Sequence, residues 1–343
     1  MTTARIPGHT AQPPAAVYDT ALLDLDGVVY AGAAAIDHAV EALDAARSCG
    51  MRLAYVTNNA SRPPRAVAEH LTSLGVPAEP ADVINSAQAA ARLVAEKVPA
   101  GSKVLVIGGA GLVEALAERG LVAVESLADG PAAVVQGFDP SVGWARLAEA
   151  SYAVAAGLPW VASNLDMSIP TARGIAPGNG TLVAAVRTAT GAEPEVAGKP
   201  LPPMHRETVL RTGAKRPLVV GDRLDTDIEG AHNGGVDSLL VFTGVTTPAQ
   251  LLTAPVRQRP TYLAADLRGL LEPHPEVTAL PDGGFGCRGV RARVLDGELR
   301  LEGASSAGDR FDGLRALCAA AWAALDGGGE PVDGRKALAE LGW

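Results

Sequence analysis

The sequence predicts an α/β protein in which a parallel sheet is covered by helices and is followed by a small α+β appendage. From Tyr18 to about residue 272, short apolar runs alternate with amphipathic stretches, which is the pattern of successive βα units. After residue 274 the pattern changes to a hairpin and one apolar helix. We therefore expect this last segment to fold as a separate element.

The first two βα units carry the strongest patterns. Residues 19–26 (DTALLDLD) and 52–59 (RLAYVTNN) are expected to form buried strands. The helices expected after them, at 35–50 and 63–75, close on glycines, which favour helix ends. Such crossover helices join parallel neighbours in a sheet. Further strands are expected at 103–109, 132–138, 216–223 and 237–244, with helices at 142–157, 180–191 and 225–235.

The C-terminal segment has a different pattern. Apolar and polar residues alternate over 289–303 around Asp296-Gly297, a favoured two-residue hairpin turn. An apolar helix is expected over 309–328. Because residues 274–343 contain no convergent set of polar side chains, we interpret them as a small domain for packing or dimerisation. A homodimer is therefore one expected assembly.

Length and charge limit the function. A chain of 343 residues exceeds the usual single-domain size, so two domains, or one domain with a large insertion, are expected. The formal net charge is −9 and no basic block is present, which excludes the usual nucleic-acid surface. In an acidic protein, a site for an anionic small molecule needs concentrated local donors or a metal ion.

Cysteine usage and the N-terminus indicate the compartment. Cys49, Cys287 and Cys318 are odd in number and lie far apart, as expected for free thiols in a reducing environment. Residues 1–17 contain prolines and polar residues where a signal peptide would be apolar, and we expect them to form a flexible tail. No apolar run reaches the length of a membrane span. The protein is therefore expected to be cytoplasmic, without a membrane partner.

Two aspartates, Asp24 and Asp26, follow the first expected strand. Residues two apart in a strand face the same side, so both carboxylates can point to one site if the strand continues to its end. In open parallel sheets, ligands bind beyond the carboxyl ends of the strands. The alternative is a turn or helix cap, because aspartate before glycine is a common turn signal. On their own, the two aspartates favour neither interpretation over the other.

Two further clusters carry groups suited to phosphate. Thr57, Asn58 and Asn59 end the second strand, and hydroxyl, amide and backbone N–H groups before a helix can hold an anion. An ordinary capping cluster is the alternative. Lys199 lies between glycine and proline and is one of only five lysines. Its ammonium could neutralise a phosphate oxygen, or it could be a solvated surface lysine.

The fourth cluster follows the strand expected at 216–223, where Asp222 is succeeded by Asp225 and Asp227. Neighbouring carboxylates repel one another unless a divalent cation gathers them, and oxygen ligands suit Mg²⁺. The alternative is that Asp225 or Thr226 caps the next helix. We expect capping to explain one of the three aspartates but not Asp222.

Taken in order, the segments DLDGVVY, VTNNASR, GKP and GDRLDTDI resemble the four motifs of the haloacid dehalogenase-like phosphatases. The branch with the p-nitrophenyl, phosphoglycolate and pyridoxal phosphatases is the most similar, although Val28 stands where many relatives have threonine. The resemblance covers residues 18–272. It implies a doubly wound, Rossmann-like core (18–84 and 197–272) with a large α/β cap inserted over 85–196.

The resemblance also sets aside a dinucleotide site and suggests a narrower group. The segment GGAGLV, residues 108–113, lacks the G-x-G-x-x-G fingerprint. The segment 163–191, together with the C-terminal region, resembles the actinobacterial glycerol 3-phosphate phosphatases. In that group the C-terminal domain, here residues 274–343, is similar to part of an acetyltransferase fold.

Residue by residue, the resemblance implies a mechanism. Asp24 would be the nucleophile that forms an aspartyl-phosphate, and Asp26 the general acid and base. Mg²⁺ would be held by Asp24, the Asp26 backbone carbonyl, Asp222 and Asp227. The phosphate-binding residues would be Thr57, Asn58, Asn59 and Lys199. Asn164 and Asp166 would either bind substrate hydroxyls or only shape the cap loop, and we weight these roles equally.

The expected activity is Mg²⁺-dependent hydrolysis of a small phosphorylated metabolite. Glycerol 3-phosphate is the first candidate, and 2-phosphoglycolate or another phosphosugar is the second. A phosphosugar mutase uses the same motifs but normally has a different cap. A noncatalytic phosphometabolite sensor is the alternative from another class, and the four intact motifs argue against it.

Overall fold

The computed structural model describes residues 6–171, 173–303 and 310–343. The chain divides into two compact units: residues up to 53 together with 214–343, and residues 54–213. The predicted α/β class is confirmed by a parallel core sheet, a second parallel sheet in a cap insertion and a C-terminal antiparallel sheet with a helix. The predicted cap boundaries at 84/85 and 196/197 stay a prediction, since the units divide elsewhere.

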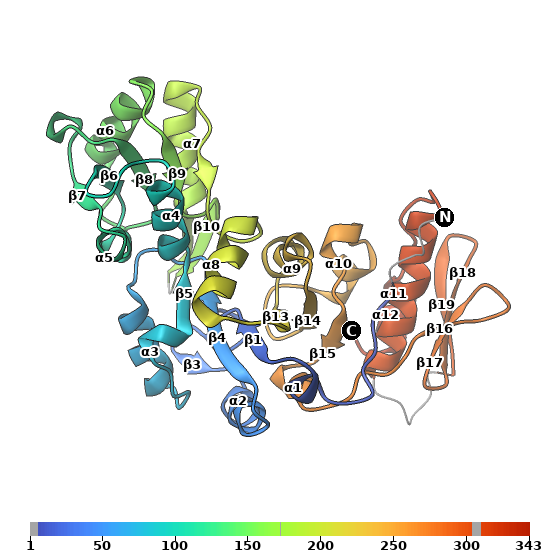
Figure 1. The fold of residues 1–343 in the computed structure, drawn as a ribbon. Coiled ribbons are helices and arrows are strands. Elements are labelled where there is room, and N and C mark those ends of the chain that lie inside the picture. Colours follow the sequence, from blue (N-terminus) through green and yellow to red (C-terminus); the bar gives the residue numbers. More distant parts are fainter. Residues whose placement is uncertain (1–5, 172, 304–309) are drawn as a thin grey trace. The chain divides into compact units, whose positions relative to one another are not determined.

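The first unit is built on four parallel strands in the order β15-β14-β13-β1 (Figure 1). Their register aligns Leu23 of β1 with Val220 of β13. Strand β1 is buried throughout, as expected for parallel strands covered on both faces. The strands are β1 (Thr20–Leu23), β13 (Pro217–Gly221), β14 (Asp237–Val241) and β15 (Tyr262–Ala264).

Helices and short turns connect these strands. The strand predicted over 19–26 ends at Leu23, so Asp24 and Asp26 lie in the loop that follows it. The helix predicted over 225–235 begins instead as a π-helical turn, Leu224–Ile228, and continues as α9 (Glu229–Gly234). The other elements here are β2 (Tyr30–Ala31), β3 (Ala34–Ala35), α2 (Ala39–Ser48) and α10 (Pro248–Leu252).

The C-terminal segment forms an antiparallel sheet in the order β16-β17-β18-β19 with helix α11 packed on it (Figure 1). The predicted hairpin turn is confirmed, because Asp296 and Gly297 both have left-handed backbone angles, with φ of 51° and 77°, as such turns require. The elements are β16 (Thr278–Ala279), β17 (Phe285–Cys287), β18 (Val290–Leu295), β19 (Glu298–Glu302), α11 (Arg310–Asp326) and α12 (Arg335–Glu340).

Helix α11 is buried nearly all round, which explains its apolar sequence. One hydrophobic cluster joins its residues Leu317 and Trp322 to Leu240 of β14 and Leu251 of α10. The Trp322 indole N–H donates to the Leu251 carbonyl at 3.0 Å. The C-terminal segment therefore shares its core with the parallel sheet of the first unit.

The flexible tail expected over residues 1–17 stays a prediction; residues 1–5 lie outside the described residues. Hydrogen bonds hold this segment, because the Gly8 N–H donates to the Thr261 carbonyl at 2.8 Å and the Thr10 N–H to the His274 carbonyl at 3.0 Å. The short helix α1 (Pro14–Val17) follows. Prolines here begin a helix, as they do at first helical positions.

The second unit contains the cap sheet, in the order β12-β9-β8-β6-β7, and the parallel pair β4 and β5. Helices α6 and α7 pack together, and their apolar residues share a hydrophobic cluster with the cap strands. The strands are β4 (Arg52–Thr57), β5 (Val83–Asn85), β6 (Lys103–Ile107), β7 (Val122–Val124), β8 (Ala133–Gln136), β9 (Trp160–Ala162), β10 (Ser168–Thr171), β11 (Gly174–Pro177) and β12 (Glu195–Val196). The helices are α3 (Pro64–Ser73), α4 (Ser86–Ala95), α5 (Ala110–Glu118), α6 (Trp144–Ala155), α7 (Asn179–Thr190) and α8 (Pro202–Thr212).

A buried ion cluster joins three segments of the second unit. The Glu207 carboxylate on α8 is fully buried and pairs with Arg92 of α4, Arg119 and Arg211. Burial alone would raise the pKa of Glu207, but the hydrogen bonds and charges of Arg92 and Arg211 outweigh it and lower that pKa. The ionised carboxylate therefore stabilises the fold.

Within the described parts of the chain, no helix combines the length and the apolar character needed to cross a bilayer.

Candidate active site

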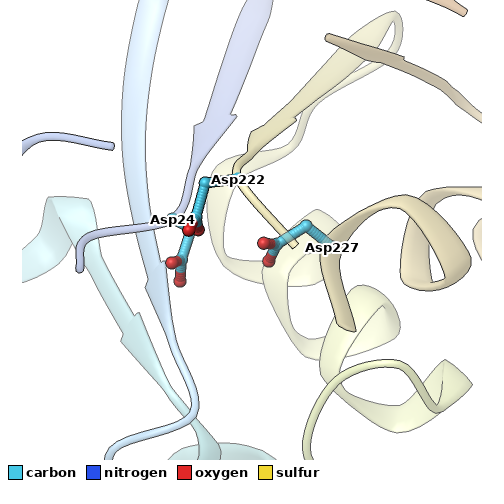
Figure 2. A group of neighbouring side chains, drawn as sticks. All are labelled: Asp24, Asp222 and Asp227. Carbon is cyan, nitrogen blue, oxygen red and sulfur yellow. The ribbon is translucent and has the colours of Figure 1, made fainter. Parts of the chain in front are cut away.

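Three carboxylates of the first unit form an acidic cluster: Asp24, Asp222 and Asp227. One oxygen of each lies within 4.8 Å of the others, and Figure 2 shows Asp24 and Asp222 side by side with Asp227 facing them from the next turn. Asp222 and Asp227 are buried, whereas Asp24 is half-buried. The structure thus brings together three of the four predicted metal-binding residues.

Strand ends place these carboxylates. Asp24 directly follows β1, and its N–H donates to the Val220 carbonyl of β13 at 2.8 Å, which extends the strand pairing to the site. Asp222 directly follows β13, and Asp227 lies on the π-helical turn after it. The Asp227 carboxylate accepts the Arg223 backbone N–H at 3.2 Å. Main-chain hydrogen bonds therefore hold the backbone of Asp24 and the carboxylate of Asp227 in place.

The Asp222 carboxylate lies against the main chain of Gly27 and Gly244, a cradle with no room for a side chain at either glycine. Its Oδ2 atom accepts the Val245 N–H at 2.7 Å. A Cβ atom at Gly244 would lie 1.9 Å from that oxygen, and one at Gly27 would lie 2.7 Å from it. Any side chain at position 244 would displace the carboxylate. The backbone of residues 244–245 thus fixes the position of the Asp222 carboxylate.

Asp225 and Asp26, the other two aspartates considered in the sequence, lie outside the acidic cluster. Asp225 is exposed and makes a two-point ion pair with the Arg223 side chain, at 2.8 and 3.1 Å. The turn begins at Leu224 without a side-chain cap, so capping by Asp225 or Thr226 is wrong. Asp26 is exposed in the loop after β1. Its predicted role in metal binding uses the backbone carbonyl and stays a prediction.

The residues present fit a divalent cation. Three carboxylates this close repel one another, and a cation relieves that repulsion. Oxygen ligands in a site formed by two strand ends and a tight turn suit a hard ion such as Mg²⁺.

The second unit brings Asn58 and Lys199 together in a pair that we call the amide clamp. The Asn58 Oδ1 atom accepts the Lys199 N–H at 2.8 Å, and its Nδ2 atom donates to the Lys199 carbonyl at 3.2 Å. The Lys199 ammonium donates to the Val56 carbonyl at 3.0 Å. A Cβ at Gly198 would lie 2.7 Å from the Asn58 oxygen, so glycine permits this contact. Two predicted phosphate-binding residues are thus joined.

Thr57 and Asn59 form the turn beside the clamp. The Thr57 hydroxyl accepts the Asn59 N–H at 3.1 Å. The Asn59 carboxamide accepts the Ser61 N–H at 2.9 Å, which is an Asx turn. This turn precedes α3, whose N-cap residue Pro63 makes no side-chain capping bond, so Asn59 shapes the turn and does not cap the helix.

Comparisons with known proteins agree with this arrangement. A family model described as haloacid dehalogenase-like hydrolase matches residues 21–122, and a HAD-hydrolase-like model matches residues 196–270. A D-glycerol 3-phosphate phosphatase of Mycobacterium tuberculosis is 47% identical over 268 residues, 78% of this chain and 75% of the relative. The chain belongs to the haloacid dehalogenase-like hydrolases.

Other relatives place it among the phosphatases of this family. An acid sugar phosphatase of Staphylococcus aureus is 38% identical, covering 73% of this chain and 95% of its own. A crystal structure of glycerol phosphate phosphatase from M. tuberculosis in complex with magnesium has a TM-score of 0.86 and 41% identity, covering 96% and 98% of the two chains. The predicted family and reaction class, phosphoric monoester hydrolysis, are confirmed.

The C-terminal region of this hydrolase matches a separate model. Residues 287–343 match a GCN5-related N-acetyltransferase like domain. Their antiparallel strands and α11 belong to the first unit.

In this hydrolase the loop between β9 and β10, residues 163–167, contacts the amide clamp, and we call it the cap loop. The Asn164 Nδ2 atom donates to the Asn58 carbonyl at 2.7 Å, and its Oδ1 atom accepts the Asp166 N–H at 3.1 Å. Asn164 is 4% exposed. The Asp166 Oδ1 atom accepts from the Asn58 carboxamide at 3.3 Å. Asn164 thus fits the loop-shaping alternative, while Asp166 remains half-buried.

Sequence reasoning missed several residues that support the two sites. Gly244 was included in a predicted strand without a role, and Ser86, whose hydroxyl donates to the Asn58 carbonyl, was not singled out. The available signal for Gly244 was a glycine just beyond a buried strand, next to the strand of Asp222. No local pattern marked Ser86, because its contact joins residues that are far apart in the sequence.

Proposed function

We propose that this hydrolase cleaves glycerol 3-phosphate to glycerol and phosphate. The observation that carries the proposal is the acidic cluster of Asp24, Asp222 and Asp227 in a chain 47% identical to a D-glycerol 3-phosphate phosphatase. The phosphorylated metabolite is the partner, and we propose no nucleic-acid or membrane partner.

The metal proposed for the acidic cluster is Mg²⁺. Asp24, Asp222 and Asp227 would hold it, with the backbone carbonyl of Asp26, and the related M. tuberculosis enzyme has a structure in complex with magnesium. When bound, the ion would neutralise the carboxylates and the phosphate oxygens, which lets an anionic nucleophile approach an anionic ester.

Asp24 and Asp26 are proposed to share the chemistry. The Asp24 carboxylate attacks phosphorus, the ester P–O bond breaks, and the departing alkoxide takes the proton of Asp26. Asp26 then removes a proton from water, whose oxygen attacks the aspartyl-phosphate and releases phosphate and free Asp24. The exposure of Asp26 supports its role, because a proton carrier must meet both water and the leaving alcohol.

Thr57, Asn58, Asn59 and Lys199 are proposed to bind the phosphoryl oxygens. The Asn58 carboxamide is occupied by Lys199, so we assign its contribution to the backbone N–H. Asp166 is proposed to contact the alcohol portion of the substrate. The sequence offered Asn164 equally for this contact, but its carboxamide is bonded to Asn58 and Asp166 at both ends.

A second candidate substrate is a phosphosugar or 2-phosphoglycolate. The 38% identity to an acid sugar phosphatase favours a phosphosugar. A noncatalytic sensor would bind one of these esters without turnover.

A panel of phosphate esters, assayed with Mg²⁺ and with a chelator, tests the proposal. Glycerol 3-phosphate should give the highest kcat/KM, and the chelator should remove activity. A higher kcat/KM for a phosphosugar or 2-phosphoglycolate would overturn the substrate. Binding of an ester without hydrolysis would favour the sensor.

We further propose that the protein works in the cytoplasm and as a homodimer. All three cysteines are free, which supports a reducing compartment. Cell fractionation tests the first statement. Light scattering during gel filtration tests the second, and a monomeric mass at cellular concentration would contradict it.

A further inference from the structure

Asn164 uses both ends of its carboxamide within the protein. The Nδ2 atom donates to the Asn58 carbonyl at 2.7 Å and lies 3.3 Å from the Ser163 hydroxyl. The Oδ1 atom accepts the Asp166 N–H at 3.1 Å. With 4% of the residue exposed, little of the group is available to a substrate. A buried carboxamide with both ends bonded acts on its neighbours' geometry.

The atom that Asn164 contacts belongs to the amide clamp. The Asn58 carbonyl accepts from Asn164 and also from the Ser86 hydroxyl. The carboxamide of the same residue, Asn58, holds the backbone of Lys199 on both its N–H and its carbonyl. A shift of the Asn58 main chain would therefore move Lys199.

The other side of the cap loop is anchored as well. The Asn179 Nδ2 atom, at the start of α7, donates to the Asn164 carbonyl at 2.8 Å. The Gly180 N–H donates to the Asp166 carbonyl at 2.9 Å. The loop is thus tied to α7 on one side and to the clamp on the other.

We propose that Asn164 is a positioning residue for phosphate binding: it connects the cap loop to the amide clamp and does not select the alcohol. This proposal rests on one part of the proposed function, namely that Lys199 and the Asn58 backbone N–H bind the phosphoryl group. Its consequence is that changing Asn164 affects every phosphate ester alike, because all of them share that group.

Asn85 provides a matched control. It is also fully buried, its Nδ2 atom donates to the Arg62 carbonyl at 3.0 Å, and its Oδ1 atom accepts the Gln88 N–H at 3.1 Å. Asn164→Asp and Asn85→Asp each remove a donor to a main-chain carbonyl and bury a new carboxylate, and the carboxylate at position 85 would cap the first turn of α4. Only the first change places a carboxylate against the carbonyl of the amide clamp.

The experiment measures kcat/KM for glycerol 3-phosphate and p-nitrophenyl phosphate, and inhibition by inorganic phosphate. N164D should lower both kcat/KM values by the same factor, about tenfold or more, and raise the phosphate Ki. N85D should change each by less than about threefold. Thermal unfolding checks both variants. If N164D does not fold, N164S and S86A serve instead. Both remove a donor to the Asn58 carbonyl, so their combined effect should exceed the product of the single effects.

Two results would overturn the proposal. One is a changed ratio between the two esters with an unchanged phosphate Ki, which would make Asn164 a selector of the alcohol. The other is an equal loss in N164D and N85D, which would reduce its role to general stability. If the wild-type enzyme does not hydrolyse glycerol 3-phosphate, the proposed substrate fails. The p-nitrophenyl phosphate and inorganic phosphate measurements still decide the role of Asn164.

Discussion

The acidic cluster and the amide clamp hold their side chains by opposite means. The cluster gathers three like charges within 4.8 Å, fixed by strand ends and by the backbone at Gly244. The clamp pairs dipoles, with the Asn58 carboxamide bonded to the Lys199 main chain. The first arrangement is stabilised by a cation, whereas the second is complete without one. Changes in the two regions should therefore differ in their dependence on Mg²⁺.

Replacing the nucleophile should have the largest effect. Asp24→Asn should lower kcat by a factor of at least about 10⁴, because an amide does not replace a carboxylate nucleophile. The fold should persist, as shown by circular dichroism and the Tm. Asp225→Asn is the control, because Asp225 is exposed and pairs with Arg223. Retained hydrolysis in D24N would contradict the assignment of Asp24.

A methyl group at Gly244 should perturb the acidic cluster alone. Gly244→Ala would place carbon 1.9 Å from the Asp222 oxygen, so we expect the Mg²⁺ concentration for half-maximal activity to rise by about 10- to 100-fold. Gly143→Ala is the control, since a Cβ there meets nothing within 4 Å. An unchanged Mg²⁺ midpoint in G244A would show that the cradle does not set metal affinity.

Breaking the amide clamp should leave metal dependence intact. Asn58→Ala removes both bonds to the Lys199 main chain, and we expect kcat/KM to fall by about tenfold or more through misplacement of that lysine. The Mg²⁺ midpoint, measured as for G244A, should stay within about twofold of wild type. If the Mg²⁺ midpoint of N58A rose as far as that of G244A, the acidic cluster and the amide clamp would not act independently.

Between pH 6.5 and about 4, acid should weaken the first unit more than the second, because burial lowers the pKa of His274 in the first unit further than that of His205 in the second. Burial lowers the pKa of His274 to about 4 from an ordinary 6.5. The unfolded chain therefore binds this proton at higher pH than the folded one, and stability falls as the pH drops from 6.5 to about 4. The loss is at most about 3 kcal/mol. Glu207 has a lowered pKa, so its contribution in the second unit is lost only below its ordinary 4.5.

Amide hydrogen exchange between pH 7 and 4 would check this difference between the units. Protection should fall in the first unit between pH 6.5 and 4, and His274→Gln should flatten that change. A larger loss of protection in the second unit than in the first over this range would contradict the prediction.

The parts predicted from sequence are those with local signals. Strands such as β13 are buried on both faces and so read as apolar runs, and Asp296-Gly297 marked its hairpin because both residues tolerate positive φ. Asp222 was separated from a capping role because it follows a strand directly. The carboxylates of Asp24 and Asp222 could be brought together because both follow parallel strands.

The parts that were missed depend on long-range contacts. The hydrogen bonds of Gly8 and Thr10 to Thr261 and His274 join residues that are more than 250 positions apart, so no local pattern predicted them. The hairpin of β10 and β11 was not predicted, since Pro170 and Pro177 interrupt the alternation of a strand. The two-sided anchoring of Asn164 depends on contacts with Asn58 and Asn179, which no sequence period reports.

The shared core around α11 has a consequence for how the molecule is made. The first unit is discontinuous, and its hydrophobic cluster includes Trp322 and Leu338 as well as Leu240. On the ribosome, the segment bearing Asp24 emerges early, while the helix that completes its core emerges about 300 residues later, so this unit closes only late in synthesis. The intervening residues, 54–213, form their own compact unit and are synthesised in full before α11 emerges. A nascent chain halted near residue 272 would expose the apolar surface that α11 covers, and would be prone to aggregate before it could act.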